Sequence, residues 1–107
     1  MSLGEEMKNN HVELNGTLTR DIELSKNLKG NDFVRFTLAC VRDGDHPYTD
    51  FINCIAFGSM APEICKHCTK GTSYSITGNI RTSSYEKNGK KIYTTNVVVE
   101  SFLLLHD

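Results

Sequence analysis

The four cysteines are the residues of this 107-residue chain whose type and spacing first point to metal or redox chemistry. Cys65 and Cys68 have the CxxC spacing of a zinc or redox site, but zinc requires four ligands. Cys40 and Cys54 lie in predicted strands without that spacing, so they do not complete such a site. A redox pair usually lies at a helix N-terminus, whereas this pair lies towards the end of a predicted helix. We therefore expect a packed Cys68, an exposed Cys65, and neither a metal site nor a cofactor.

A second candidate cluster lies in the loop after residue 42 and consists of acidic side chains and a histidine: Asp43, Asp45, His46 and Asp50. Acidic residues in a hairpin loop are more common as turn formers, and no cluster of Arg, Lys or His accompanies these in the sequence. We expect no catalytic residue and no enzyme. A metal- or thiol-dependent enzyme remains the alternative from a different functional class.

Aromatic residues offer a different kind of chemistry, the stacking of flat rings. Phe51 and Phe57 lie six residues apart on one predicted strand and therefore share a face. The opposite face, which begins at Ile52, is apolar too. Either the two phenylalanines are core residues and the opposite face packs in an oligomer, or they are exposed platforms on which bases of any sequence can stack. We favour the second interpretation, and we expect Tyr74 and Tyr93 to pack in the core.

Charge is distributed unevenly along a chain whose formal net charge is −1. Residues 66–91 contain six basic side chains and one acidic one, a net charge of +5, whereas residues 1–50 have a net charge of −3. The near-neutral total excludes a protein that binds by bulk positive charge, as histones do. The second half could nevertheless supply a positive track for phosphates. The alternative is a solvated hairpin whose lysines protect a sheet edge.

These side chains must be positioned by a mostly β-stranded fold. Alternating apolar and polar residues predict five strands, over residues 11–18, 33–41, 48–57, 73–82 and from 92 to near 105. Residues 25–32 predict a polar turn, and Asn88-Gly89 is the strongest short-range hairpin signal. A helix of about 8–10 residues fits between the third and fourth strands, because Ser59 is a suitable N-cap and Gly71 a suitable stop.

This order of elements is typical of an all-β domain with one short helix. Five antiparallel strands with a helix between the third and fourth is the layout of the OB-fold, a five-stranded Greek-key barrel. Gly16 and Gly78 fit the sharp coiling that a small barrel requires. Another small β-barrel or an α+β sandwich is the alternative. We expect a single domain over residues 9–105, preceded by an extension over residues 1–8.

In five segments the residue types themselves are more specific than the alternation of apolar and polar positions: residues 12–21, 36–39, 50–58, 70–85 and 91–99. In this order they resemble the strands of the SSB family, the bacterial and phage single-stranded DNA-binding proteins, and the resemblance covers about residues 9–105. It implies an OB-fold domain that binds single-stranded DNA of any sequence in DNA replication, recombination and repair. It also implies a homotetramer, with a dimer as the alternative.

The resemblance further implies which side chains contact DNA. Bases would stack on Phe51, Phe57 and Tyr85, and Tyr48 is the nearest candidate for a further aromatic of the family. Lys70 and Arg81 match cationic positions of the family. Further candidates for phosphate binding are Lys87 and Lys91 in the basic second half of the chain, and Arg35 in the second strand. Ser83 and Ser84 stand where the family usually has basic residues, so this chain departs from the pattern there.

Subunit contacts are implied for the first strand and for one position of the third: Asn10, His11, Val12, Glu13, Leu14 and Ile52. The family recruits replication and repair proteins through a flexible C-terminal tail, and we expect such partners here only if a tail exists. A primosomal OB-fold adaptor that works mainly through protein contacts is the nearer alternative function.

The cellular setting is also an expectation. The chain has no apolar run long enough for a transmembrane helix and no secretory signal at its start, and four cysteines without an export signal favour free thiols in a reducing compartment. We expect a cytoplasmic, nucleoid-associated protein that does not bind membranes. Its near-neutral charge predicts a DNA affinity that depends on stacking more than on counterion release, with a shallow salt dependence.

Overall fold

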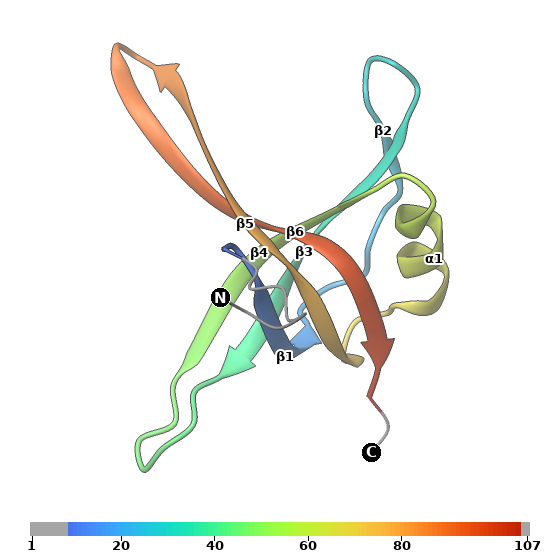
Figure 1. Cartoon of the computed structure of the whole chain (residues 1–107), viewed down its shortest axis with the longest axis vertical. Helices are drawn as coiled ribbons and strands as arrows, with labels where there is room; N and C mark the ends of the chain where they lie inside the picture. The colour runs from blue at the N-terminus through green and yellow to red at the C-terminus, as the bar shows by residue number, and fades with distance from the viewer. Residues whose placement is uncertain (1–8, 106–107) are drawn as a thin grey trace, which may run out of the picture.

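The computed structural model describes residues 9–105, so the extension expected over residues 1–8 lies outside the described residues. Within residues 9–105 the chain forms six strands and one helix (Figure 1). The strands are β1 (Val12–Leu18), β2 (Ser25–Lys26), β3 (Asp32–Val41), β4 (Thr49–Phe57), β5 (Ser73–Lys87) and β6 (Lys90–Leu104), and the helix is α1 (Met60–His67). The helix lies between β4 and β5, which confirms the predicted order of strands and helix.

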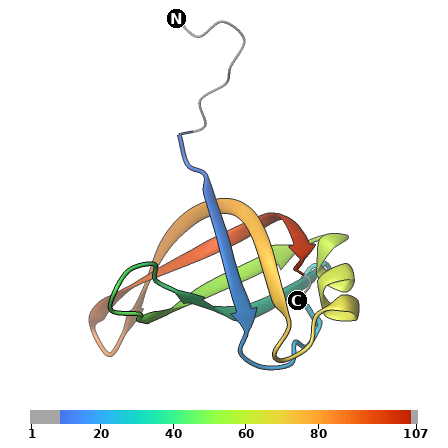
Figure 2. The same cartoon turned by 90° about the horizontal axis from the view of Figure 1, so that it is seen from below.

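The strands form one sheet that closes on itself as a small barrel. Their hydrogen-bonded order is β1-β5-β6-β4-β3-β2, and β1 closes the barrel by pairing with β3 through Thr17 and Leu18. Figure 2 shows the strands curving around a common interior, with α1 at one end. The structure confirms a barrel of the OB type. Its junction of β4 with β6, at Cys54 and Val97, is parallel, a detail that alternation in the sequence does not reveal.

β2 is a short strand in a segment for which the sequence predicted only a turn. It pairs with the start of β3, and Lys26 Nζ donates to the carboxylate of Asp32 over 2.7 Å. The loop between them is held by Asn27, whose Oδ1 accepts the backbone N–H groups of Lys29 and Asn31 over 2.9 and 3.0 Å. This local capping by an Asn side chain is what allows two polar residues to pair.

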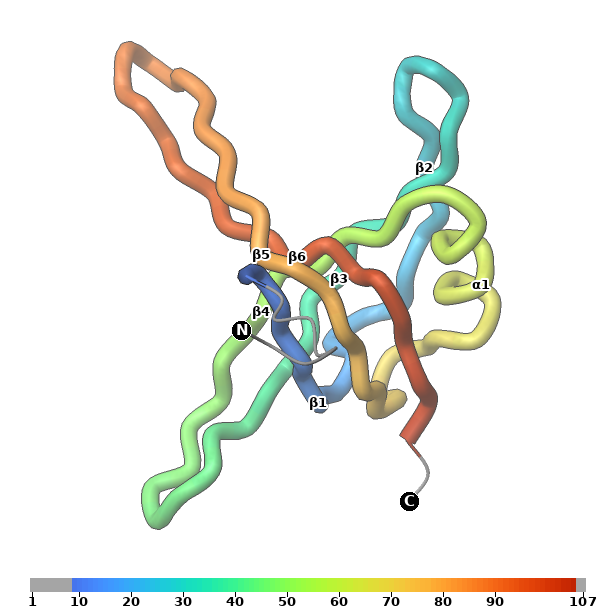
Figure 3. Tube along the Cα trace, in the orientation of Figure 1, coloured from blue at the N-terminus to red at the C-terminus, as the bar shows by residue number. Residues whose placement is uncertain are grey.

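β5 and β6 are each 15 residues long, so their hairpin extends beyond the barrel as an arm, defined here as residues 80–96. The ladder with β1 ends where the side chain of Asn10 hydrogen-bonds to the backbone N–H and C=O of Ile80, over 2.8 and 2.7 Å. At the tip, Asn88 and Gly89 both have positive φ angles, 53° and 77°, as a tight hairpin turn requires. The predicted hairpin is therefore confirmed. Figure 3 shows the arm and the β3–β4 hairpin projecting in different directions.

The core fills the barrel and the space beneath α1. Its largest fully buried side chains are Val34, Leu38, Cys54, Ile64 and Ile76. Cys68 is buried as predicted, and so is Tyr74, whose hydroxyl donates to the carbonyl oxygen of His67 over 2.8 Å. A tyrosine in a core needs such a partner for its hydroxyl, because an unsatisfied buried polar group is costly.

Two glycines let the backbones of the barrel approach closely. A Cβ atom at Gly16 would lie 2.6 Å from the carbonyl oxygen of Ala39, and one at Gly78 would collide with the carbonyl of Val98. A β-bulge between Thr77 and Gly78 adds to the coiling. The structure thus confirms the role expected for both glycines.

The helix differs from its prediction in detail. Ser59 occupies the N-cap position, but its side chain accepts no capping hydrogen bond, and the helix ends at His67, before Gly71. Residues 9–105 contain no helix that is long and apolar enough to cross a membrane.

Candidate nucleic-acid interface

The outer surface of β3 and β4 carries the two phenylalanines singled out in the sequence. Phe51 and Phe57 are 65% and 51% exposed, whereas Cys54 and Ala56 on the opposite face of β4 are buried. The alternation of a strand forces this division, because the inward face already fills the barrel. The interpretation of Phe51 and Phe57 as core residues is therefore wrong, and both rings are accessible to a ligand.

The cross-strand register adds a residue that the sequence analysis missed. Phe33 lies directly opposite Phe57, and Arg35 lies opposite Ile55, so these four side chains share the outer face. The guanidinium carbon of Arg35 lies 5.5 Å from the centroid of the Phe33 ring. Alternation from residue 33 onwards could have placed Phe33 beside Arg35, but only the register shows that it adjoins Phe57.

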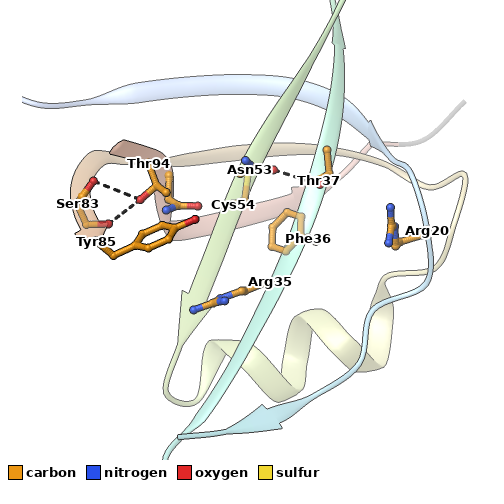
Figure 4. A pocket seen from close by; sticks show the side chains of 10 residues that line it. Arg20, Arg35, Phe36, Thr37, Asn53, Cys54, Ser83, Tyr85 and Thr94 are labelled. Carbon is orange, nitrogen blue, oxygen red and sulfur yellow. Dashed lines mark hydrogen bonds between the residues drawn. The ribbon is translucent and has the colours of Figure 1, made fainter. Parts of the chain in front are cut away.

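A groove of about 700 Å³ lies between this surface and the arm (Figure 4). Arg20 and Arg35 supply its positive charge, and Tyr85, which is 52% exposed, supplies a ring. In Figure 4, Tyr85 and Arg35 lie towards one end of the groove and Arg20 towards the other. The described residues that line the groove include no carboxylate, and neither arginine forms an ion pair within residues 9–105. Free guanidinium groups in the same groove as an exposed ring suit a ligand that is both anionic and flat.

Neutral polar groups line much of the remaining groove. Thr37 Oγ1 donates to Asn53 Oδ1 over 3.4 Å, and the hydroxyl oxygens of Ser83 and Thr94 lie 2.6 Å apart. Asn96 lies next to them in the lining. Ser83 is one of the positions where the resemblance implied a basic residue, so the wall of the groove offers hydrogen bonds there in place of charge.

The arm has two faces, because successive residues of a strand point to opposite sides. Its groove face carries Tyr85 together with Arg81 and Lys87, two of the residues predicted to bind phosphate. Its outer face carries Lys91 and Tyr93, with Lys91 Nζ 5.6 Å from the centroid of the Tyr93 ring. The structure therefore divides the predicted phosphate-binding residues of the arm between its two faces.

Tyr93 is not in the core, contrary to the prediction from the sequence. Its side chain is 72% exposed, because β6 at this position has left the barrel and pairs, among the described strands, with β5 alone. Alternation in a sequence shows which face a residue takes. It does not show where a strand leaves the barrel.

Lys70 lies far from the arm. It follows α1 in the turn before β5, where its backbone N–H donates to the carboxylate of Asp21 over 2.9 Å. The arm projects from the other end of β5, as Figure 1 and Figure 2 show. The structure does not bring Lys70 together with Tyr85, so a strand that contacts both must pass around the barrel.

Tyr48 lies in the β3–β4 loop and is stacked with Arg42, whose guanidinium carbon is 4.9 Å from the ring centroid. Arg42 also donates two hydrogen bonds to the carboxylate of Asp50, over 2.8 and 2.9 Å, and these lower the pKa of Asp50. The pair is neutral, but Asp43 and Asp45 in the same loop leave the surroundings of the Tyr48 ring negatively charged. Within residues 9–105, no group of three or more His, Cys, Asp and Glu residues could hold a metal ion.

The residues predicted at a subunit interface include an apolar set that the structure brings together. Val12, Leu14 and Ile52 line a second hollow, of about 310 Å³, and Phe51 forms part of its rim. Val12, Leu14 and Ile52 are half-buried and pack against the core. Phe51 thus lies beside the predicted interface, and not in the groove that contains Tyr85.

The open edge of β1 is a second feature of this region. β1 pairs with β5 along most of its length but with β3 only at its last two residues, so residues 12–16 have one edge without a described partner strand. His11 and Glu13 are exposed beside this edge. Asn10 has a role within the chain, since its side chain binds the backbone of Ile80.

The two buried cysteines lack the properties of reactive thiols. Cys54 is buried, and burial raises the pKa of its thiol to about 12. Burial also raises the pKa of Cys68. Cys65 is half-buried, not exposed as predicted, because its Sγ lies 3.5 Å from the carbonyl oxygen of Ile22. All four cysteines are free in the structure.

Comparison with known proteins agrees with this geometry. The model of the "Single-strand binding protein family" matches residues 9–105. The chain is 48% identical over 95 residues to a single-stranded DNA-binding protein of Clostridium perfringens and 41% identical over 98 residues to one of Fusobacterium nucleatum. These alignments cover 87% and 86% of this chain and 63% and 64% of the relatives, so the chain spans less than two thirds of their length. Single-stranded DNA-binding protein 1 of Streptococcus pyogenes is 39% identical over 90% of this chain and 78% of its own length. The chain therefore belongs to the single-strand binding protein family.

Proposed function

We propose that the chain binds single-stranded DNA without sequence preference and holds it without covalent chemistry. One observation carries the proposal: one groove contains Arg20, Arg35 and the exposed ring of Tyr85, and its described lining contains no acid. The names of the relatives as single-stranded DNA-binding proteins support it. An aromatic ring accepts any base, since every base has a π-face, and this suits binding without sequence readout.

In this mechanism the groove holds a short stretch of the strand. Arg35 and Arg20 hold phosphates, and Arg81 and Lys87 continue the positive track along the groove face of the arm. A base stacks on Tyr85, which contributes roughly 1–3 kcal/mol. The neutral hydroxyl and amide groups of the wall can bind base edges or water.

Other predicted side chains extend the contact beyond the groove. Phe57 lies at the end of β4, beside a hollow formed with the β2–β3 loop. Phe51 and Tyr48 provide further exposed rings, and Lys70 a distant positive charge. These residues remain proposed contacts of a longer strand that wraps around the barrel.

The same proposal includes self-association. The open edge of β1 and the apolar hollow at Val12, Leu14 and Ile52 fit a second copy of the chain, in a homotetramer or a dimer. The cellular role would be the protection of single strands in the cytoplasm during replication, recombination and repair. Proteins of these processes would be partners through a C-terminal tail, if the full-length protein has one.

The test is a fluorescence-anisotropy titration with labelled oligo-dT and with a duplex of the same length. We expect tight binding to oligo-dT and weak binding to the duplex, because stacked and paired bases cannot reach Tyr85. Equal binding to both, or no binding at low salt, contradicts the proposal. Weak binding together with a dimeric mass would instead favour the adaptor function.

A further inference from the structure

Lys70 lies in a tight turn whose closing hydrogen bond leaves its own backbone N–H free to bind elsewhere. The N–H of Thr72 donates to the carbonyl oxygen of Thr69 over 3.1 Å, so Lys70 and Gly71 are the two central residues of a β-turn. Gly71 has a φ angle of 88°, the positive value that the third position of a type II turn requires. The free N–H of Lys70 donates to Asp21 Oδ1 over 2.9 Å. The carboxylate of Asp21 therefore ties this turn to the segment that follows β1.

The segment that contains Asp21 is anchored on both sides. Before it, the backbone of the buried Leu18 accepts the N–H of Gly71 over 3.0 Å and donates to the carbonyl oxygen of Thr72 over 2.9 Å. After it, the side chain of Ile22 packs against the core. Because Asp21 lies between these two anchors, its carboxylate can hold the exposed turn in one place.

Arg20, the residue before Asp21, belongs to the groove. It lies towards the end of the groove opposite Tyr85, as Figure 4 shows. The backbone N–H and the hydroxyl of Thr19 both donate to the carbonyl oxygen of Thr37, over 3.3 and 3.2 Å, and Thr37 itself lines the groove. These bonds fix the backbone before Arg20 to β3. The turn held by Asp21 thus lies next to this end of the groove.

We propose that Asp21 is a positioning residue, which holds Lys70 where a strand that leaves the groove past Arg20 meets it as the next phosphate contact. The inference rests on the proposed function and adds to it the exit of the strand from the groove. None of these three residues lines the apolar hollow beside β1. Asp21 acts through its hydrogen bond and not through its charge, because a negative charge between two cations repels a phosphate. Lys70 is exposed, and a phosphate contact from an unfixed turn would lose more conformational entropy on binding.

The experiment compares Asp21→Asn with Asp21→Ala, because both remove the charge and only asparagine keeps an oxygen that can accept the N–H of Lys70. Each variant is titrated at several salt concentrations with an oligo-dT of about 16 nucleotides, the upper length that one OB-fold covers. We expect the slope of log K against log salt concentration to be shallower by about 0.7 for Asp21→Ala, the value for one lost phosphate contact. At about 0.1 M salt this variant should bind about fivefold more weakly than Asp21→Asn, because a slope of about 0.7 over one decade of salt is a factor of about five.

The same comparison in a Lys70→Gln background shows whether Asp21 acts through the lysine. Without the lysine charge, we expect the two Asp21 variants to differ by less than about twofold and to have equal slopes. A merely structural role would not depend on the side chain of Lys70, since the hydrogen bond uses its backbone. Glu23→Gln is the matched control, because it removes a neighbouring charge from the hollow beside Arg20, and it should keep the slope of the unchanged protein.

Two results would overturn the inference. One is equal binding and equal slopes for Asp21→Asn and Asp21→Ala, and the other is a difference between them that persists in full in the Lys70→Gln background. Asp21 is exposed, so neither variant removes a core contact, and circular dichroism checks that both are folded. The proposed function fails separately, if the unchanged protein does not bind oligo-dT.

Discussion

Exposed rings and unpaired guanidinium groups define the binding surface at the scale of single residues. Phe57 and Tyr85 each leave about half of their surface in water, which is unusual for large apolar side chains. A stacked base removes that surface from water and adds a π–π contact. Arg20 and Arg35 supply charge without an acidic partner in the groove. These side chains therefore contribute little to the stability of the fold and would instead stabilise a bound ligand.

Removal of one ring tests this role directly. Phe57→Ala should weaken oligo-dT binding by roughly 1–3 kcal/mol, measured by anisotropy, because one stacked base loses its platform. The thermal unfolding midpoint should stay unchanged, since the ring lies outside the core. Leu103→Ala, which truncates a 67% exposed side chain at the end of β6, is the matched control. A lower midpoint would show that Phe57 supports the fold instead.

Removal of one groove charge should change the salt dependence. Arg20→Gln should make the slope of log K against log salt concentration shallower by about 0.7, the value for one phosphate contact with a single strand. Arg42→Gln is the control, because Arg42 is paired with Asp50 outside the groove. Titrations at several salt concentrations measure both slopes. Identical slopes for the two variants would contradict a phosphate contact at Arg20.

Close backbone contacts decide how the strands are arranged at the scale of elements. β1 can meet β3 at the closure of the barrel only because Gly16 has no side chain where the carbonyl of Ala39 approaches. Further along, Asn10 ends the pairing of β1 with β5, so the arm continues as a two-stranded hairpin. The separation into barrel and arm thus depends on one glycine and one asparagine.

The closure of the barrel requires a residue without a Cβ atom at position 16, and a substitution of Gly16 tests this requirement. Gly16→Ala should lower the free energy of unfolding by about 1–3 kcal/mol, measured by urea denaturation, because the added methyl group forces the backbones apart. Asn15→Ala is the control, since Asn15 is the exposed neighbour on the same strand. An unchanged unfolding free energy for Gly16→Ala would show that β1 and β3 do not approach as described.

Projecting hairpins and uneven charge characterise the whole molecule. Its radius of gyration is 15.7 Å, above the roughly 13 Å of a compact 100-residue chain, because hairpins extend from the barrel. These extensions give a small core a large surface, on which the positive groove and the apolar hollow beside β1 occupy different places. Single-strand binding and self-association can therefore use separate parts of one small domain.

Self-association should depend on the hollow. Leu14→Glu should lower the mass measured by light scattering to that of one chain, because a carboxylate would be buried against a second copy. Val12→Glu, nearer the end of β1, is a second variant that disturbs the core less, and circular dichroism checks that both remain folded. Leu28→Glu introduces the same carboxylate at a fully exposed position of the β2–β3 loop and should leave the mass unchanged. A retained oligomer in both glutamate variants would place the interface elsewhere.

Much of the fold was predictable, because its signals are local. The alternation around Phe51 and Phe57, the Asn88-Gly89 turn and the glycine at position 16 each indicate structure within a few residues. Tyr93 was mispredicted and Phe33 was missed for a different reason. Their surroundings depend on strands that are distant in the sequence, and a short sequence window does not include those strands.

The sequence by itself determined the all-β barrel with one helix, the family, and the exposed side of β4. It could do so because periodicity, turn residues and family motifs are properties of the chain alone. Only the tertiary structure decided that Arg20 joins Arg35 in one groove, that Tyr85 and Tyr93 lie on opposite faces of the arm, and that Lys70 is remote from both. These facts depend on cross-strand register and on the closure of the barrel, which bring together residues far apart along the chain.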